Sequence, residues 1–268
     1  MHEFGYVTAS SGLNLRAAPT IDADVLLTIP HGQPVALLGT ETAGWLGAQV
    51  GTLCGYVWAA HIDRRAVRTT FSAPLLAELS ATCRVDPLLV QAVVQVESGG
   101  RAFAHGRLII RFEPHLFIER LSGNDRDKAT VRFQVGSPTW DGAQHRLWRS
   151  GWSPFHGNQD MEYIALNMAR EVNVDLAVES TSLGAPQILG GHWNALGYAS
   201  AQAMFYAFAN SADEQLRAFF HFLEVSGALK RLRKGDLRGF ASLYNGPAQA
   251  DRYAALLTAA VARLRGAA

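Results

Sequence analysis

The stretch VVQVESGG, residues 93–100, closes an apolar helical run on a single acid, Glu97. The run begins at Asp86-Pro87, where the acid can cap the first turn and proline occupies a position whose N–H has no helical partner. Apolar residues then recur at helical spacing, and Gly99-Gly100 indicates the end of the helix. We therefore expect a helix with Glu97 on its last turn, around which the larger part of the chain is organised.

Glu97 shares a helix face with Val90 and Val93, which the apolar pattern places in the core. Burial disfavours a charged carboxylate, and so does the negative end of the helix macrodipole, so both effects predict a raised pKa for Glu97. A carboxyl that stays protonated near neutral pH has the property that a general acid needs to protonate a glycosidic oxygen. The alternative, from this stretch alone, is a solvated acid at a helix end.

The overall composition limits the classes of function. The chain has 268 residues, of which 18% are charged, and a formal net charge of +1. A nucleic-acid-binding protein usually has a basic excess, so this balance argues against one. No apolar run reaches the roughly 18 residues of a membrane span, so none is expected. The two cysteines, Cys54 and Cys83, fall in different predicted domains and do not support a disulfide framework; Cys83 is expected to be buried in mid-helix.

Residues 6–63 contain short alternating apolar and polar segments, interrupted at close intervals by Gly, Pro and Ser. This pattern predicts a small all-β barrel. The order LNLRAAP, IPHGQPV, a tryptophan and GYV resembles a bacterial SH3-like (SH3b) domain over nearly all of this segment. The resemblance implies a domain, residues 1–63, that binds a cell-wall polymer or peptide. A domain that only packs on its neighbour is the alternative.

Residues 64–71 are polar and basic without apolar periodicity, which indicates a linker. From residue 72 onward the pattern becomes helical. Besides the helix that ends near Glu97, we expect helices from Ser72 to Cys83, at 160–178, from Ser211 to Leu223, at 237–243 and at 248–264. A short β-rich run at 106–115 interrupts them. The sequence thus predicts a mostly α domain, residues 72–268, with one small β insertion.

Four motifs occur in a fixed order in this second domain: VESGG, GRLIIRFEPHLF, SLGAPQI and FASLYNGP. Their order resembles the lysozyme superfamily of goose-type lysozymes and soluble lytic transglycosylases. The closer resemblance, over roughly residues 75–262, is to N-acetylmuramidases of phage endolysins and bacterial genomes, once described as a domain of unknown function. In one departure, Leu183 stands where an aromatic residue often precedes the glycine of the third motif. Whether a sugar-stacking contact exists there stays open.

The resemblance implies a lysozyme-like fold and a peptidoglycan hydrolase that cleaves the β-1,4 bond between N-acetylmuramic acid and N-acetylglucosamine. Glu97 is then the general acid. A second carboxyl that positions water is expected from the β insertion, and Glu113 lies at its end. The alternative for Glu113 is a structural ion pair with Arg111 or Arg107. Glu179 is a rival second acid, or else it lies at the end of the preceding helix.

The same motifs supply the candidate substrate-binding residues, which are Ser98, Glu179, Ser182, Gln187, Tyr244 and Asn245. Gln187 either bonds a sugar group or is a buried structural amide, and Tyr244 either lines the cleft or is a core residue. Among the other aromatic side chains, Trp140, Trp148 and Trp152 are expected either to stack on sugars or to pack in a core cluster. In the first domain Trp45, Tyr56 and Trp58 are candidates for a binding surface, and for Trp45 and Trp58 a place in the core is the alternative.

No cofactor and no metal site are expected. The histidines at positions 105, 115, 145, 156 and 192 show no metal-ligand spacing, and no Ser-His-Asp or Cys-His nucleophile motif is present. Two other functions stay open: a lytic transglycosylase that leaves 1,6-anhydro-muramic ends, and a wall-binding protein without catalytic activity. The second is disfavoured because the acid is present.

The N-terminal sequence MHEFGYV lacks the charged and apolar regions of a Sec signal. We therefore expect synthesis in the cytoplasm, followed by holin- or secretion-system-type release to the cell wall in the periplasm or outside. The expected partners are peptidoglycan glycan strands, together with the wall ligand of the SH3-like domain. Neither nucleic acid nor a membrane span is expected, and the chain is expected to act as a monomer.

Overall fold

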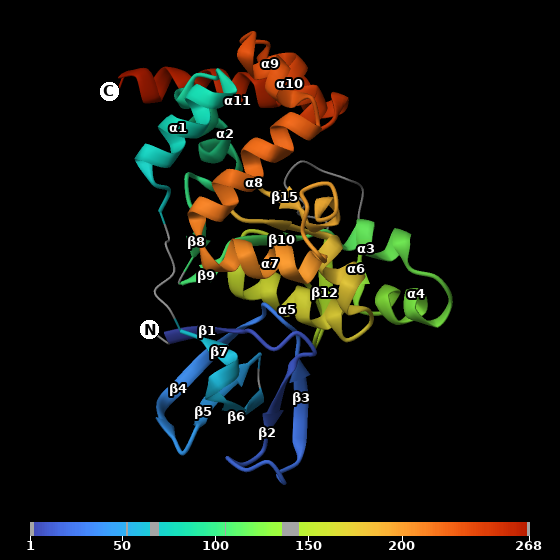
Figure 1. Ribbon diagram of the computed structural model, residues 1–268. Helices are drawn as coiled ribbons and strands as arrows, with labels where there is room; N and C mark the ends of the chain where they lie inside the picture. The colour runs from blue at the N-terminus through green and yellow to red at the C-terminus, as the bar shows by residue number, and fades with distance from the viewer. Residues whose placement is uncertain (1–2, 52, 65–69, 105, 136–144, 267–268) are drawn as a thin grey trace.

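The architecture divides into a β-rich lobe and a helical body (Figure 1). The computed structural model describes residues 3–51, 53–64, 70–104, 106–135 and 145–266. Most of the linker expected at 64–71 lies outside these described residues. The expected fold class, a small all-β part followed by a mostly α part with a β insertion, is confirmed. Among the described residues, no helix combines the length and the apolar character needed to cross a membrane.

The β-rich lobe is one seven-stranded antiparallel sheet with the order β3-β2-β6-β5-β4-β1-β7. Its strands are β1 (Glu3–Val7), β2 (Leu13–Arg16), β3 (Val25–Ile29), β4 (Pro34–Thr42), β5 (Trp45–Val50), β6 (Leu53–Trp58) and β7 (Ile62–Asp63). Burial alternates along β5, so every second side chain points into the lobe's own core. That core includes Leu15, Leu46 and Val57.

The helical body begins and ends with helices that pack together at the top of Figure 1. They are α1 (Ala73–Cys83), α2 (Pro87–Ser98), α8 (Ala212–Val225), α9 (Ala228–Arg233), α10 (Leu237–Tyr244) and α11 (Ala250–Gly266). The C-terminal helix α11 packs on both α2 and α10. This packing brings the end of the chain to the end of α2.

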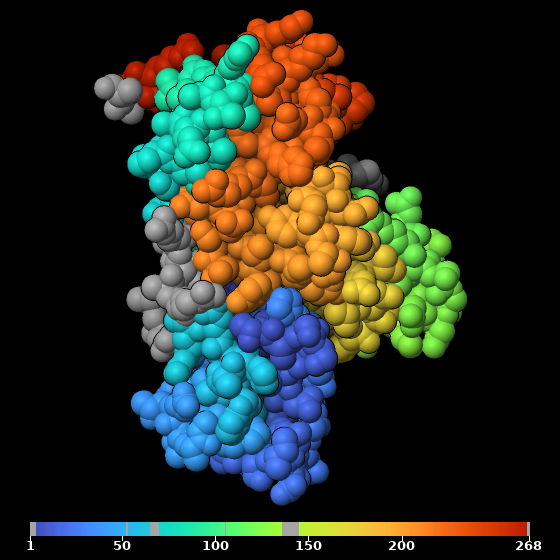
Figure 2. Space-filling model, viewed as in Figure 1, coloured from blue at the N-terminus to red at the C-terminus, as the bar shows by residue number. Residues whose placement is uncertain are grey.

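Within the described residues, three small sheets and five α-helices lie between these two groups. The sheets pair β8 (Phe103–Ala104) with β9 (Arg107–Leu108), β10 (Ile110–Phe112) with β14 (Thr181–Leu183) and β15 (Ile188–Leu189), and β11 (Phe133–Gln134) with β12 (Arg146–Trp148) and β13 (Trp152–Pro154). The helices are α3 (Pro114–Arg120), α4 (Gly123–Thr130), α5 (Gln159–Arg170), α6 (Val174–Glu179) and α7 (Ala201–Asn210). In Figure 2, α3 and α4 (green) project from one side of the body.

The signals at both ends of α2 are used as the sequence predicts. The Asp86 side chain accepts a hydrogen bond from the Leu88 N–H, and Pro87 is the first helical residue. At the other end Gly99 adopts the left-handed conformation, with φ of 64°, and its N–H bonds the Gln95 carbonyl. The helix therefore ends just after Glu97, which lies on its last turn.

Two local expectations are wrong. The single helix expected at 160–178 is two helices, α5 and α6, because the side chain of Asn173 caps a new helix by accepting from the Leu176 N–H. Cys83 is the last residue of α1 and is half-buried, because Arg84 ends the helix in the left-handed conformation. Neither Cys83 nor Cys54 forms a disulfide.

The two lobes are joined by hydrogen bonds between side chains that are far apart in the sequence. Buried Gln33 accepts from Arg170 and donates to Asn167 Oδ1 over 2.7 Å, both on α5. Tyr6 donates to the Gly106 carbonyl over 3.0 Å. Arg170 is buried and, among the described residues, has no carboxylate partner and no other hydrogen bond. Gln33 therefore compensates a buried charge across the junction.

We expect Gln33→Ala to lower the free energy of unfolding by about 1–3 kcal/mol, because it leaves the buried Arg170 guanidinium without its partner and removes the hydrogen bond to the half-buried Asn167. Urea unfolding of the full chain measures the change. Gln49→Ala is the matched control, since the Gln49 side chain bonds only the nearby Gly51 carbonyl. Equal losses in the two variants would contradict a stabilising role for the junction.

Candidate active site

Glu97 lies at the end of α2, opposite α10 and α11. Tyr253 on α11 donates its hydroxyl to Glu97 Oε1, and Asn245 Nδ2 lies 3.5 Å from the same oxygen. The residue as a whole is half-buried. Burial raises the pKa of Glu97 to about 7, while the Tyr253 and Asn245 hydrogen bonds and the Arg111 charge act in the opposite direction. Burial is thus the dominant cause of the raised pKa that the sequence predicts.

Tyr253 is the site residue that the sequence analysis missed. It lies on the buried face of α11 and its ring stacks on that of Tyr244, with 6.3 Å between the ring centroids. Burial raises the pKa of the Tyr253 phenol well above its ordinary value, so the hydroxyl keeps the proton that it donates to Glu97. The only sequence signal is an aromatic residue on an apolar helix face, which is also typical of any core position.

Tyr244 and Gln187 meet at the turn between β14 and β15. The Tyr244 hydroxyl donates to the Pro186 carbonyl, and Gln187 Nε2 donates to the Gly184 carbonyl over 2.7 Å. Gly184 has a φ of 71°, and a Cβ at this position would collide with the buried Gln215 side chain. Tyr244 therefore ties α10 to this turn, and Gln187 helps to close it.

Leu183, which departs from the family pattern, is fully buried on β14, opposite Ile110 on β10. At this position the side chain belongs to the core. Ser182, the next residue back, lies directly opposite Arg111 across the same pair of strands. Cross-strand partners point to the same face of a sheet, so Ser182 shares the face of Arg111.

Glu113 follows β10 and occupies the position before α3. Arg111 Nε donates to Glu113 Oε1 over 2.8 Å, so the ion pair with Arg111 exists, whereas Arg107 pairs with Asp160. The Arg111 charge also acts on Glu97. Arg111 thus lies within electrostatic reach of both candidate carboxyls, and the catalytic role of Glu113 stays a prediction.

The α5 helix fixes the position of β10. Gln159 bonds both the N–H and the carbonyl of Ile110, at 2.9 and 2.8 Å, and Glu162 Oε2 accepts from the Phe112 N–H over 2.9 Å. Side-chain amide and carboxylate groups therefore take the place of a neighbouring strand along this edge of β10. As a result Arg111 and Glu113 project from an anchored strand.

Two predicted site residues have other partners. Ser98 Oγ donates to the Val94 carbonyl of its own helix over 3.2 Å. Glu179, at the end of α6, accepts from Trp193 Nε1 over 3.1 Å and pairs with Arg120. The described contacts of Glu179 thus connect it to neighbouring structural elements, whereas those of Glu97 connect it to Tyr253 and Asn245.

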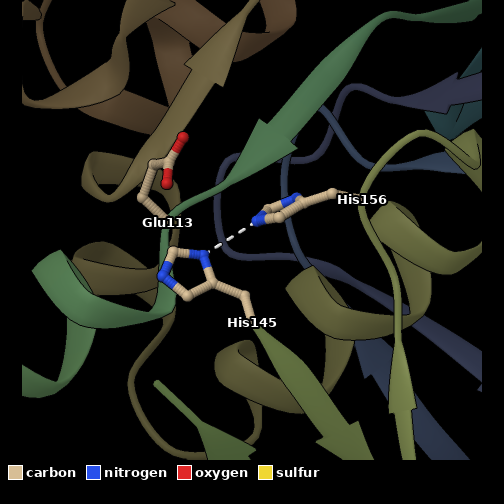
Figure 3. A group of neighbouring side chains, drawn as sticks. All are labelled: Glu113, His145 and His156. Carbon is tan, nitrogen blue, oxygen red and sulfur yellow. Dashed lines mark hydrogen bonds between the residues drawn. The ribbon is translucent and has the colours of Figure 1, made fainter. Parts of the chain in front are cut away.

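Glu113 also belongs to a second group of side chains, with His145 and His156 (Figure 3). His145 precedes β12 and His156 lies between β13 and α5. Burial, with nearby positive charge, lowers the pKa of each imidazole to about 4, so both rings are neutral. Within the described residues, these three are the side chains whose ligand atoms lie close enough together to hold a metal ion.

The exposed tryptophans belong to neither core. Trp148 and Trp152 lie on the β12–β13 hairpin, 48% and 37% exposed, with their rings edge to face. The core alternative is therefore wrong for this pair, and contact with sugar rings stays a prediction. Trp140 lies outside the described residues. In the β-rich lobe Tyr56 and Trp58 are also exposed, whereas Trp45 is half-buried against Trp58.

We expect Glu97→Gln to raise the free energy of unfolding by about 2 kcal/mol at pH 8 and by less at pH 5. The pKa of Glu97 is raised from about 4.5 to about 7 by folding, so its contribution to stability is complete below about pH 4.5 and is lost as the pH rises through about 7. Urea unfolding at the two pH values measures this. The control is Glu119→Gln at an exposed position of α3, and a gain in Glu97→Gln that is the same at both pH values would contradict burial as the cause.

Comparison with known proteins identifies two regions. Residues 86–265 match the sequence profile of the N-acetylmuramidase family, and residues 11–63 match that of the bacterial SH3 domain. A search of curated proteins found no match.

A search of solved structures found similarity to the crystal structure of the Burkholderia AP3 phage endolysin. The two chains share 33% sequence identity, with a TM-score of 0.56, and the match covers 74% of this chain and 72% of the endolysin chain. The family profile alone spans more than half of this chain and includes α2, β10, α10 and α11. The chain therefore belongs to the N-acetylmuramidase family and carries a bacterial SH3 domain ahead of the region that defines that family.

Proposed function

We propose that this chain hydrolyses the β-1,4 bond between N-acetylmuramic acid and N-acetylglucosamine in peptidoglycan. The observation that carries the proposal is the state of Glu97, a half-buried residue on the last turn of α2 whose carboxyl has a pKa of about 7. A group with this pKa is protonated in a large fraction of molecules near neutral pH and still transfers its proton readily. Family membership and the similarity to a phage endolysin support the same activity.

In the proposed reaction Glu97 protonates the glycosidic oxygen as the bond breaks. The carboxylate that this step creates accepts hydrogen bonds from Tyr253 and Asn245 and lies within reach of the Arg111 charge. All three interactions favour the ionised form of Glu97, whereas burial favours the neutral form. They therefore stabilise the product of proton transfer more than the reactant, which is the requirement for lowering the barrier.

Glu113 is the proposed second group, which orients the water that attacks the oxocarbenium-like sugar. Its side chain is 15% exposed and one of its oxygens is held by Arg111, which leaves the other available for water. We propose that Ser182 and Asn245 contact the sugars, because Ser182 lies on the face of Arg111 and Asn245 lies beside Glu97. Ser98, Gln187, Tyr244 and Glu179 have structural partners and are proposed to shape the cleft rather than to bind sugar directly.

The SH3-like region, proposed as residues 1–63, would bind the cell wall and bring the muramidase domain, residues 72–268, to its substrate. Tyr56 and Trp58 are exposed and provide an aromatic surface for such binding. By analogy with the endolysin that it resembles, we propose that the chain reaches the wall by holin- or secretion-system-type release.

We expect Glu97→Gln to lower the rate of peptidoglycan cleavage by about 1,000-fold or more, because the amide cannot donate the required proton. Glu113→Gln is expected to lose about 100-fold, and Glu119→Gln, at an exposed position of α3, is expected to keep full activity. Mass spectrometry of the soluble fragments, before and after borohydride reduction, measures both rate and product. Reducible N-acetylmuramic acid ends are expected.

Other products of that digest would contradict the proposal in defined ways. Anhydro-muramic ends would show a lytic transglycosylase and remove the water-positioning role of Glu113. Reducing N-acetylglucosamine ends would show a glucosaminidase, and new amines without new sugar ends would exclude a glycosidase. A Glu97→Gln variant that binds the wall and still cleaves it would remove Glu97 from the mechanism.

The pH profile tests the hydrogen bond to Glu97. Activity is expected to fall as the pH rises through about 7, because the general acid loses its proton. Tyr253→Phe removes a donor that lowers the pKa of Glu97, so the alkaline limb of the profile should move up by about 1 pH unit. Tyr198→Phe, at a half-buried tyrosine without a contact to Glu97, is the control. A downward shift in Tyr253→Phe would exclude the assigned role.

A further inference from the structure

Glu113, His145 and His156 converge from three separate segments of the chain (Figure 3). One ligand atom from each side chain lies within 4.8 Å of the other two. His145 Nδ1 and His156 Nε2 face each other at 2.9 Å. This set was not visible in the sequence, because no two of its members have the short spacing of a metal-binding motif.

The cluster has the outer support that metal-binding histidines usually have. His156 Nδ1 lies 2.8 Å from Glu162 Oε1, and the other oxygen of Glu162 accepts from the Phe112 N–H. The Glu162 side chain is only 2% exposed, so the contact is shielded from water. When an ionised Glu162 accepts from His156 Nδ1–H, it fixes the orientation of the imidazole and leaves Nε2 with a lone pair directed at the cluster.

The distance between the two histidine nitrogens is close to that of a tetrahedral site. Nitrogen ligands about 2.0–2.1 Å from a zinc ion lie about 3.3 Å apart, so the two histidines would separate by about 0.4 Å on binding. Arg111 holds Oε1 of Glu113 and leaves Oε2 for the ion. His115 Nδ1 lies 3.6 Å from that Oε2, but His115 is not among the side chains whose ligand atoms converge, so a fourth position would be filled by water.

We propose that Glu113, His145 and His156 form a binding site for a divalent transition-metal ion of the zinc class. Two imidazoles and one carboxylate suit zinc, whereas calcium and magnesium prefer oxygen ligands alone. Without an ion, one of these two histidines donates a hydrogen bond to the other. With an ion bound, His145 Nδ1 and His156 Nε2 both present lone pairs to it, and the proton of His145 is then on Nε2. The binding itself does not depend on the proposed function, since Glu97 is not a ligand.

An ion in this site also affects the proposed reaction, and this consequence does rest on the proposed function. When Glu113 binds the ion, its carboxylate can no longer orient the attacking water as proposed for the metal-free chain. Zinc is therefore expected to lower the cleavage rate of the wild-type chain. A chain that binds zinc but is not inhibited would preserve the site and exclude the role of Glu113 in cleavage.

The test is zinc binding to the full chain, without an affinity tag and after removal of metal, measured by calorimetry and by competition with a chromogenic chelator. We expect one ion per chain with a dissociation constant of about 1 μM or below. His145→Ala and His156→Ala should each weaken binding by about 100-fold, and Glu162→Gln by about 10–100-fold. His221→Ala, at an exposed position on α8, is the matched control and should bind as the wild type does.

X-ray absorption of the zinc-loaded wild-type chain adds a measurement that needs no variant to fold. Scattering from two imidazoles together with oxygen ligands is expected. Substoichiometric binding, binding that survives the paired His145→Ala and His156→Ala substitutions, or a zinc environment without imidazole would each overturn the proposal. In those cases the three residues form only the hydrogen-bonded chain that ends at Glu162.

Discussion

The packing of α11 against α2 is the constraint on which the rest of the site depends. It places Tyr253 beside Glu97 although the two residues are 156 positions apart in the chain. The same packing supplies the Tyr253 hydroxyl, whose hydrogen bond opposes the effect of burial on the pKa of Glu97. Burial raises the pKa of Glu97 to about 7, and the hydrogen bonds of Tyr253 and Asn245 and the Arg111 charge oppose it. The site costs stability, because a carboxylate in this position prefers to be neutral.

A second constraint positions Arg111 and Glu113, which belong to and follow strand β10. Strand β10 is held on one edge by β14 and on the other by Gln159 and Glu162 of α5. The side chain of Phe112 anchors β10 by packing in a cluster of aromatic rings that includes Phe117 and Phe133. An anchored strand of this kind can present Arg111 and Glu113 in a fixed geometry, as charged groups near a reaction require. Glu162 serves two purposes, since it also bonds His156.

The sequence predicts those parts of the structure that depend on neighbouring residues. The limits of α2 follow from Asp86-Pro87 and Gly99, and the raised pKa of Glu97 follows from its place on an apolar helix face. The apolar periodicity continues across Asn173, so it predicts one helix where there are two. The start of the second helix is marked only by Asn173, a residue type that often caps helices. Tyr253 and the pairing of His145 with His156 could not be found, because each depends on tertiary contacts between segments without a shared motif.

The junction around Gln33 distinguishes this chain from one whose two domains are joined only by a flexible tether. Buried hydrogen bonds from Gln33 and Tyr6 fix the β-rich lobe against α5 and the β8–β9 hairpin, and the lobes meet without a visible gap on the side that Figure 2 shows. A flexible tether lets a catalytic domain search every bond within its radius. Under the proposed function, a lobe fixed in this way would limit the glycosidic bonds that reach Glu97 to those at one offset and one orientation from the wall contact. The spacing of cuts along a glycan strand would then be determined by the distance between two surfaces of the protein, and not by diffusion of a linker.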